Sequence, residues 1–165
     1  MKKIMLVVAG SAFLFAACNK DCKTGYTGKD CADQIVPGTI TMNSVEVTSY
    51  AETKEDGGGW DISDGPDMYF EIYQNDSKIF TSNTVTDLAG ASTLVYADGM
   101  PFNISSVQDN FTIKFFDDDD LFADELMGSF NVDFYMDGNG FPDVISLDNP
   151  DGSDFVFNID VEYNF

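Results

Sequence analysis

The sequence contains no histidine and no arginine, so lysine is its only basic residue. Without histidine, a catalytic serine or cysteine lacks its usual general base. The chain has only three cysteines, which without histidine give too few ligands for the usual zinc site. Its eight lysines face 29 aspartates and glutamates, giving a formal net charge of −21. Nucleic acid repels such a chain, so we expect no nucleic-acid partner.

The first 17 residues have the pattern of an export signal. Lys2 and Lys3 precede an apolar run over residues 4–14, and small residues lead to Cys18. The stretch 15–18, Phe-Ala-Ala-Cys, resembles the lipobox of bacterial lipoproteins. That resemblance implies a lipid on Cys18 and an anchor in the outer membrane, on the periplasmic or the cell-surface face. An ordinary secretory signal is the alternative, and either signal takes the protein out of the cytoplasm.

Removal of residues 1–17 leaves 6 lysines against the same 29 acids, a formal charge of −23. If Cys18 carries lipid, Cys22 and Cys31 remain as one pair, and an extracytoplasmic compartment allows them to form a disulfide. The stretch around them, with Gly25, Tyr26 and Gly28, is similar to the final cysteine loop of an EGF-like module. We expect residues 18–38 to form a lipidated, disulfide-stapled spacer and linker.

From residue 39 onward, short apolar-alternating runs are separated by Gly, Asp, Asn and Pro. No stretch keeps a helical period for three turns. The expected strands are 40–47, 68–73, 78–81, 94–96, 102–105, 111–116, 127–135 and 155–165. In the last of these, every second residue is apolar, which predicts one buried face: Phe155, Phe157, Ile159, Val161, Tyr163 and Phe165. Residues 39–165 are therefore predicted to form an all-β, eight-stranded antiparallel β-sandwich.

A dense acidic loop is expected between the strands 111–116 and 127–135. It carries six carboxylates within the nine residues 117–125. Like charges held this close repel one another, and neither arginine nor histidine exists to offset them. A ligand set made only of carboxylate oxygens suits a hard cation, and Ca²⁺ accepts irregular geometry. The loop is thus a candidate calcium site.

A second acidic cluster, residues 56–67, leads into the strand 68–73. Asp61, five residues, then Asp67 before a tyrosine-containing strand is similar to the first calcium loop of C2 domains. Asp117, Asp119 and an acid three positions before Gly128 resemble the third loop of that family. The resemblance implies an eight-stranded, calcium-dependent membrane-binding sandwich. Its implied Ca²⁺ ligands are Asp61, Asp67, Asp117, Asp119 and Glu125, with Asp124 as the neighbour that could replace Glu125.

Two simpler interpretations stand beside this one. Acidic loops also keep surface proteins soluble without binding any ion. In addition, Asp133, Asp137, Asn139, Gly140 and Asp143 partly resemble a calcium hand loop. That segment lacks flanking helices and an acidic twelfth position, so we expect a turn there.

Apolar residues lie between the acids of both loops. In calcium-dependent C2 domains, residues at such loop tips enter the membrane, and the corresponding positions here are Ile62, Leu121 and Phe122. The resemblance implies that they dock against membrane or a partner. The alternative is that they fold back and plug the end of the sandwich.

Together these features predict a cell-envelope lipoprotein whose calcium-binding, C2-like domain docks membrane or a surface protein partner. The alternative function is a non-catalytic structural accessory subunit of an outer-membrane complex, with calcium structural or absent. Paired carboxylates can also hydrolyse glycosides, but the single Trp60 gives little for sugar stacking, and we expect no enzyme.

Overall fold

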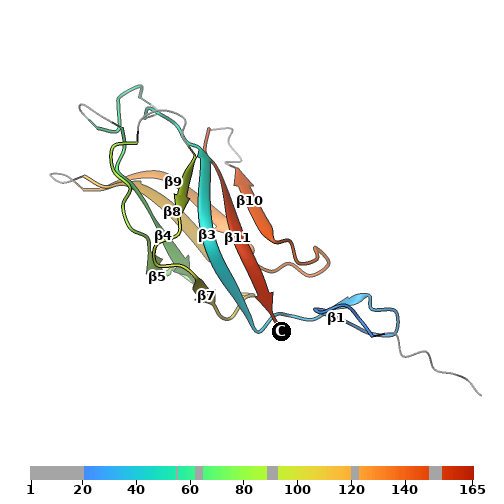
Figure 1. Ribbon diagram of the computed structural model, residues 1–165. Coiled ribbons are helices and arrows are strands. Elements are labelled where there is room, and N and C mark those ends of the chain that lie inside the picture. Colours follow the sequence, from blue (N-terminus) through green and yellow to red (C-terminus); the bar gives the residue numbers. More distant parts are fainter. Residues whose placement is uncertain (1–20, 55, 62–64, 89–92, 120–122, 149–153) are drawn as a thin grey trace, which may run out of the picture.

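The computed structural model describes residues 21–54, 56–61, 65–88, 93–119, 123–148 and 154–165 (Figure 1). These residues are all-β and contain no helix that could cross a membrane. Two sheets form a sandwich, and a two-stranded ribbon lies at one end. The strands are β1 (Tyr26–Thr27), β2 (Asp33–Gln34), β3 (Thr39–Ser49), β4 (Met68–Gln74), β5 (Ser77–Thr81), β6 (Leu94–Tyr96), β7 (Phe102–Ile104), β8 (Phe111–Asp117), β9 (Glu125–Val132), β10 (Val144–Asp148) and β11 (Val156–Asn164).

The first sheet has the order β10-β11-β3-β6, with β7 also paired to β3, and the second has the order β5-β4-β8-β9. All of these pairs are antiparallel. Strand β6 pairs with residues 45–47 of β3 and β7 with residues 40–42, so they share one interrupted edge. Pro101 lies between them and has no N–H to give to the ladder. If β6 and β7 are counted together as one interrupted strand, each sheet has four strands. The predicted eight-stranded sandwich is therefore confirmed.

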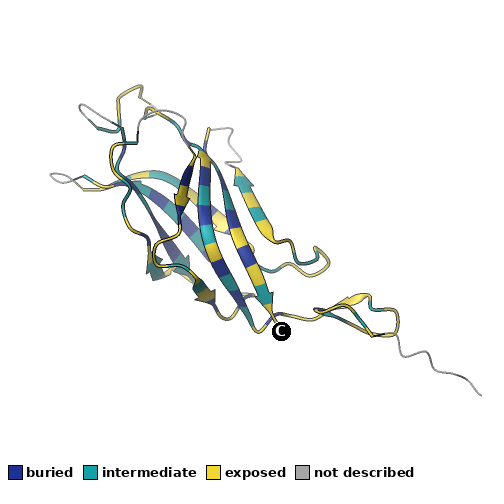
Figure 2. Cartoon of the chain, in the orientation of Figure 1, coloured by how far each residue is buried: buried dark blue, intermediate teal, exposed yellow. Residues whose placement is uncertain are grey.

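The core lies between the two sheets and is rich in phenylalanine. Burial alternates along β11, and along β3 with one interruption at residues 43–44, which Figure 2 shows as dark bands separated by lighter ones. Phe115 is fully buried, and its ring lies 4.7 Å from that of Phe155 and 5.0 Å from that of Phe157, centroid to centroid. Edge-on and tilted contacts of this kind join the two layers through aromatic packing.

Two strand predictions are corrected by the structure. The segment 144–148 forms β10, an edge strand that was not predicted. Strand β9 ends at Val132, whereas the predicted strand ran on to residue 135. Phe134 is buried all the same, because its ring packs edge-on against Phe111 at 5.1 Å. Apolar alternation therefore continued past the point where the backbone leaves the sheet.

The predicted disulfide joins Cys22 to Cys31 and holds the β1–β2 ribbon. This ribbon contacts the sandwich directly. The Tyr26 ring packs edge-on against Phe141 at 5.4 Å, and the Gln34 side-chain oxygen accepts a hydrogen bond from the Gly138 N–H. It lies at the end of the sandwich where β3 begins and β11 ends (Figure 1).

Candidate functional site

Three predicted ligands gather at the opposite end of the sandwich. Asp117, Asp119 and Glu125 each place a carboxylate oxygen within 4.8 Å of the others. Asp117 is fully buried, and the other two are partly exposed. We call these three carboxylates, at the end of the core, the acidic cluster.

Strand periodicity explains how Asp117 comes to be buried. Phe111, Ile113 and Phe115 point into the core from β8, and the next inward position is occupied by Asp117. The inward row of β8 therefore ends in the Asp117 carboxylate, and Asp119 follows two residues beyond the end of the strand, where it is half-buried.

A β-bulge decides which acid faces them from β9. Phe115 pairs with Gly128, but Phe116 pairs with Leu126, so Met127 is the extra residue. This shift places Glu125 opposite Asp117. Without the bulge, Leu126 would take that position, since one residue of register reverses the face of every side chain.

The two oxygens of Asp117 have different surroundings. Oδ1 accepts a hydrogen bond from the Asp67 backbone N–H at 2.8 Å. Oδ2 is buried and has no hydrogen-bond partner among the described residues. Burial raises the pKa of the Asp117 carboxyl to about 6, with smaller contributions from Asp61, Asp119 and Asp67, while the hydrogen bond lowers it. A buried carboxylate oxygen without a donor is expensive, and a cation would satisfy it.

The remaining predicted ligands lie at different distances from this cluster. Asp61 and Asp67 are close enough to act on the charge of Asp117. Asp67 Oδ1 accepts the backbone N–H of Asp87 at 2.7 Å. Asp124 Oδ2 accepts the Tyr69 hydroxyl at 2.7 Å. Of the two alternatives proposed from the sequence, Glu125 joins the cluster and Asp124 is engaged elsewhere.

Sequence reasoning missed one member of the site. The Lys54 ammonium forms an ion pair with Glu125 Oε2. The hydrogen bond to Glu125 raises the pKa of Lys54 above its usual range, and Asp119 and Asp117 act in the same direction. The sequence argument looked for positive charge in arginine and histidine only. The signal available was that Lys54 is the one lysine between Lys29 and Lys78, seven residues before Asp61.

Four of the predicted functional positions lie outside the described residues. These are the proposed lipidation site and the proposed docking residues: Cys18, Ile62, Leu121 and Phe122.

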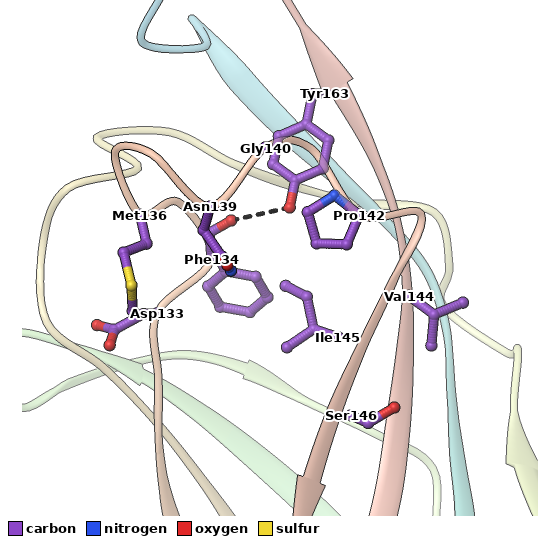
Figure 3. A pocket seen from close by; sticks show the side chains of 10 residues that line it. All are labelled: Asp133, Phe134, Met136, Asn139, Gly140, Pro142, Val144, Ile145, Ser146 and Tyr163. Carbon is purple, nitrogen blue, oxygen red and sulfur yellow. Dashed lines mark hydrogen bonds between the residues drawn. The ribbon is translucent and has the colours of Figure 1, made fainter. Parts of the chain in front are cut away.

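A cavity lies at the end of the sandwich that carries the ribbon, away from the acidic cluster. Asp133 and Met136 line one side of a cavity of about 300 Å³, and Val144 and Ser146 of β10 line the other (Figure 3). The Tyr163 hydroxyl within it donates to the Phe134 carbonyl at 3.2 Å. Asp133, Asp137 and Asp143 do not come together as a metal-binding group in the described chain. Residues 136–139 form a turn, as predicted from the sequence, in which the Asn139 N–H donates to the Met136 carbonyl at 3.2 Å.

The acidic cluster fits a calcium ion by size and by chemistry. Ca²⁺ binds oxygens at about 2.3–2.6 Å, so two ligands on opposite sides of one ion are separated by roughly 5 Å. The three carboxylates fall inside that limit, and they offer only hard oxygen ligands. A bound cation would also give the buried Asp117 Oδ2 the partner that it lacks among the described residues.

No protein-family model matches this sequence, and no curated protein matches it. Among solved structures, one described as a C2 domain matches with a TM-score of 0.50 at 11% identity, covering 75% of this chain and 97% of that chain. A C2 domain of plant extended synaptotagmin 1 matches with a TM-score of 0.53 at 16% identity, covering 79% and 97%.

Human GIVD cytosolic phospholipase A2, in complex with an inhibitor and terbium chloride, matches with a TM-score of 0.50 at 15% identity. This match covers 78% of the chain but 18% of the phospholipase. At these identities, the likeness establishes the fold alone. The chain has a C2-like β-sandwich fold.

Proposed function

We propose that this C2-like chain is a calcium-binding lipoprotein of the cell envelope. Asp117, Asp119 and Glu125 would hold the ion, with Asp61 and Asp67 completing the ligand set. The ion-loaded end of the sandwich would then dock membrane or a surface protein partner, without catalysis. Cys18 would carry the lipid that anchors the chain in the outer membrane.

One observation carries the calcium proposal. Asp117 is a fully buried acid whose Oδ2 has no donor in the described chain, and two further carboxylates lie within 4.8 Å of it. A face that only kept the protein soluble would have its acids in water, where they need no partner. A carboxylate that is buried among other carboxylates is unfavourable by itself, and a bound cation offsets that cost.

The ribbon and the acidic cluster lie at opposite ends of the sandwich, and this arrangement limits what the cluster can dock against. The linker from the ribbon enters β3 beside the C-terminal end of β11, where the Gly38 N–H donates to the Asn164 carbonyl at 2.8 Å. The acidic cluster lies at the other end (Figure 1). Strand β3 alone has 11 residues, which corresponds to about 36 Å at roughly 3.3 Å per residue. With the ribbon end toward the anchor, the cluster faces away from the anchoring membrane, which favours a partner protein or a second surface.

The alternative function also has an observation in its favour. Lys54 already supplies a positive charge to the acidic cluster, so the fold has a means of offsetting its acids without calcium. A structural accessory subunit would need nothing more. The two functions differ in whether association with envelope fractions depends on calcium.

A calorimetric titration of the purified, metal-free chain with Ca²⁺ tests the proposal. Extracellular calcium modules commonly have dissociation constants of about 10⁻⁴ to 10⁻³ M, so heat should appear at millimolar calcium. Binding to the folded state alone raises the unfolding free energy by about 2.7 kcal/mol at a hundredfold excess over Kd. No heat, together with a melting temperature equal in chelator and in millimolar calcium, would refute calcium binding.

A further inference from the structure

Lys54 lies at the point where the proposed calcium ion would bind. Its ammonium pairs with Glu125, and Asp119 and Asp117 both act on its charge. The Trp60 ring centroid lies 5.7 Å from the same nitrogen. A lysine side chain on an open surface would have many solvated rotamers to choose from, but this one pairs with Glu125 of the acidic cluster, near enough to Asp119 and Asp117 to feel their charge.

The backbone around Lys54 is held in a small hairpin. The Lys54 N–H donates to the Gly58 carbonyl at 2.8 Å, and the Gly57 N–H donates to the Lys54 carbonyl at 2.9 Å. Thr53 and Gly59 form an antiparallel bridge just outside this turn. Gly57 has a φ of +85°, a conformation that glycine adopts without strain.

A tryptophan holds the base of this hairpin against the segment that directly follows β3. The Trp60 indole N–H donates to the Ala51 carbonyl at 2.7 Å. The hairpin therefore starts from the strand that runs the length of the sandwich, and it presents Lys54 from a defined position. The fold itself therefore positions Lys54 at the acidic cluster.

We propose that Lys54 is a tethered counter-ion that occupies the acidic cluster in the calcium-free protein and must be displaced by the divalent cation. This inference rests on the proposed calcium function and deepens it. One ammonium and one Ca²⁺ cannot both hold the Glu125 carboxylate at contact distance, because the two cations would repel each other there. Lys54 would therefore raise the calcium concentration at which the site fills.

The stabilities of the two states follow from this exchange. In the calcium-free protein, Lys54 offsets repulsion among the acids, so its removal should lower the melting temperature. In the calcium-loaded protein, the ammonium has left the cluster, so its removal should matter little. A Lys54 variant should consequently show a larger calcium-induced rise in melting temperature than the wild type.

The test is calorimetric titration of Ca²⁺ into metal-free wild type and K54M. The methionine keeps the length of the side chain and removes its charge. Competition with a partly exposed ion pair predicts a Kd about fivefold lower in K54M. K54Q should shift Kd in the same direction, and it covers the case in which methionine impairs folding.

K29M is the matched control for net charge. Lys29 is exposed on the ribbon, at the far end of the molecule, and its removal changes the total charge by the same amount. Its Kd should stay within about twofold of the wild type, since long-range effects are screened at physiological salt.

The outcomes separate this inference from the function on which it rests. Tighter binding in K54M but not in K29M supports the inference. Calcium binding in K54M with none in the wild type also supports it, while refuting calcium binding by the native chain. Equal or weaker binding in K54M, with a wild type that binds, overturns the inference and leaves the calcium function standing. Binding in neither protein overturns both.

Discussion

Replacement of Asp117 by asparagine should stabilise the calcium-free protein. The substitution keeps the shape of the side chain and removes its charge. Oδ1 can still accept the hydrogen bond from the Asp67 N–H, now at 2.8 Å. In place of the unpartnered Oδ2, the new amide N–H can donate to a carboxylate of Asp119 or Glu125, both within 4.8 Å. Because a buried, unpaired polar atom costs about 1–3 kcal/mol, the unfolding free energy in chelator should rise by about that amount.

The same substitution should remove the response to calcium. The wild type gains about 2.7 kcal/mol at a hundredfold excess of calcium over Kd. D117N lacks the buried carboxylate that we place at the centre of the site, so its gain should fall close to zero. The advantage that D117N has in chelator should therefore shrink or reverse in millimolar calcium.

Thermal melts in chelator and in millimolar calcium measure both effects. For a chain of this size, 1 kcal/mol corresponds to about 2–4 °C in melting temperature. D118N is the control, because the neighbouring Asp118 accepts a hydrogen bond from the Thr84 hydroxyl at 2.9 Å and lies outside the cluster. It should stay within about 0.5 kcal/mol of the wild type and keep the calcium response. A less stable D117N in chelator, or one with the full calcium response, would refute the reasoning.

Three further predictions follow from other parts of the chain. Phe141→Ala removes the ring contact to Tyr26 and should speed hydrogen exchange in the ribbon while the calcium Kd stays unchanged; unchanged exchange there would mean that other contacts hold the ribbon. Leu121→Asp together with Phe122→Asp should abolish calcium-dependent association with liposomes or envelope fractions at an unchanged melting temperature, and a much lower melting temperature would place these side chains in the core instead. Intact-mass measurement of the mature protein should find a lipidated N-terminal Cys18 and no free thiol, and an unmodified or different N-terminus would contradict the lipobox interpretation.

The sequence alone predicted the strands whose two faces differ in polarity. Strands β4, β8 and β11 have apolar residues at alternate positions, and β3 does so with one interruption after Met42; burial of one face requires this pattern. By the same rule Asp117, two residues after Phe115, falls on the inward side of β8. Strand β10 lies at a sheet edge, where exposed and half-buried residues alternate, and the contrast in its sequence was too weak to reveal it.

The sequence also determined which residue types could meet, because chemistry and spacing are local properties. Carboxylates without arginine or histidine, and two cysteines in a short segment rich in glycine, are visible without any fold. The composition was therefore sufficient to suggest a hard cation and one disulfide.

Only the tertiary structure decided how these groups are arranged. The extra residue Met127 in β9 places Glu125 instead of Leu126 opposite Asp117, and a register shift of this kind depends on packing across the sheet. Burial of Asp117 depends on where the core ends, and the approach of Lys54 depends on a hairpin that starts beyond β3. Lys54 and Glu125 are far apart in the chain, as are Asp67 and Asp117. Distances across such separations arise from the packing of two sheets, which no local pattern in the sequence encodes.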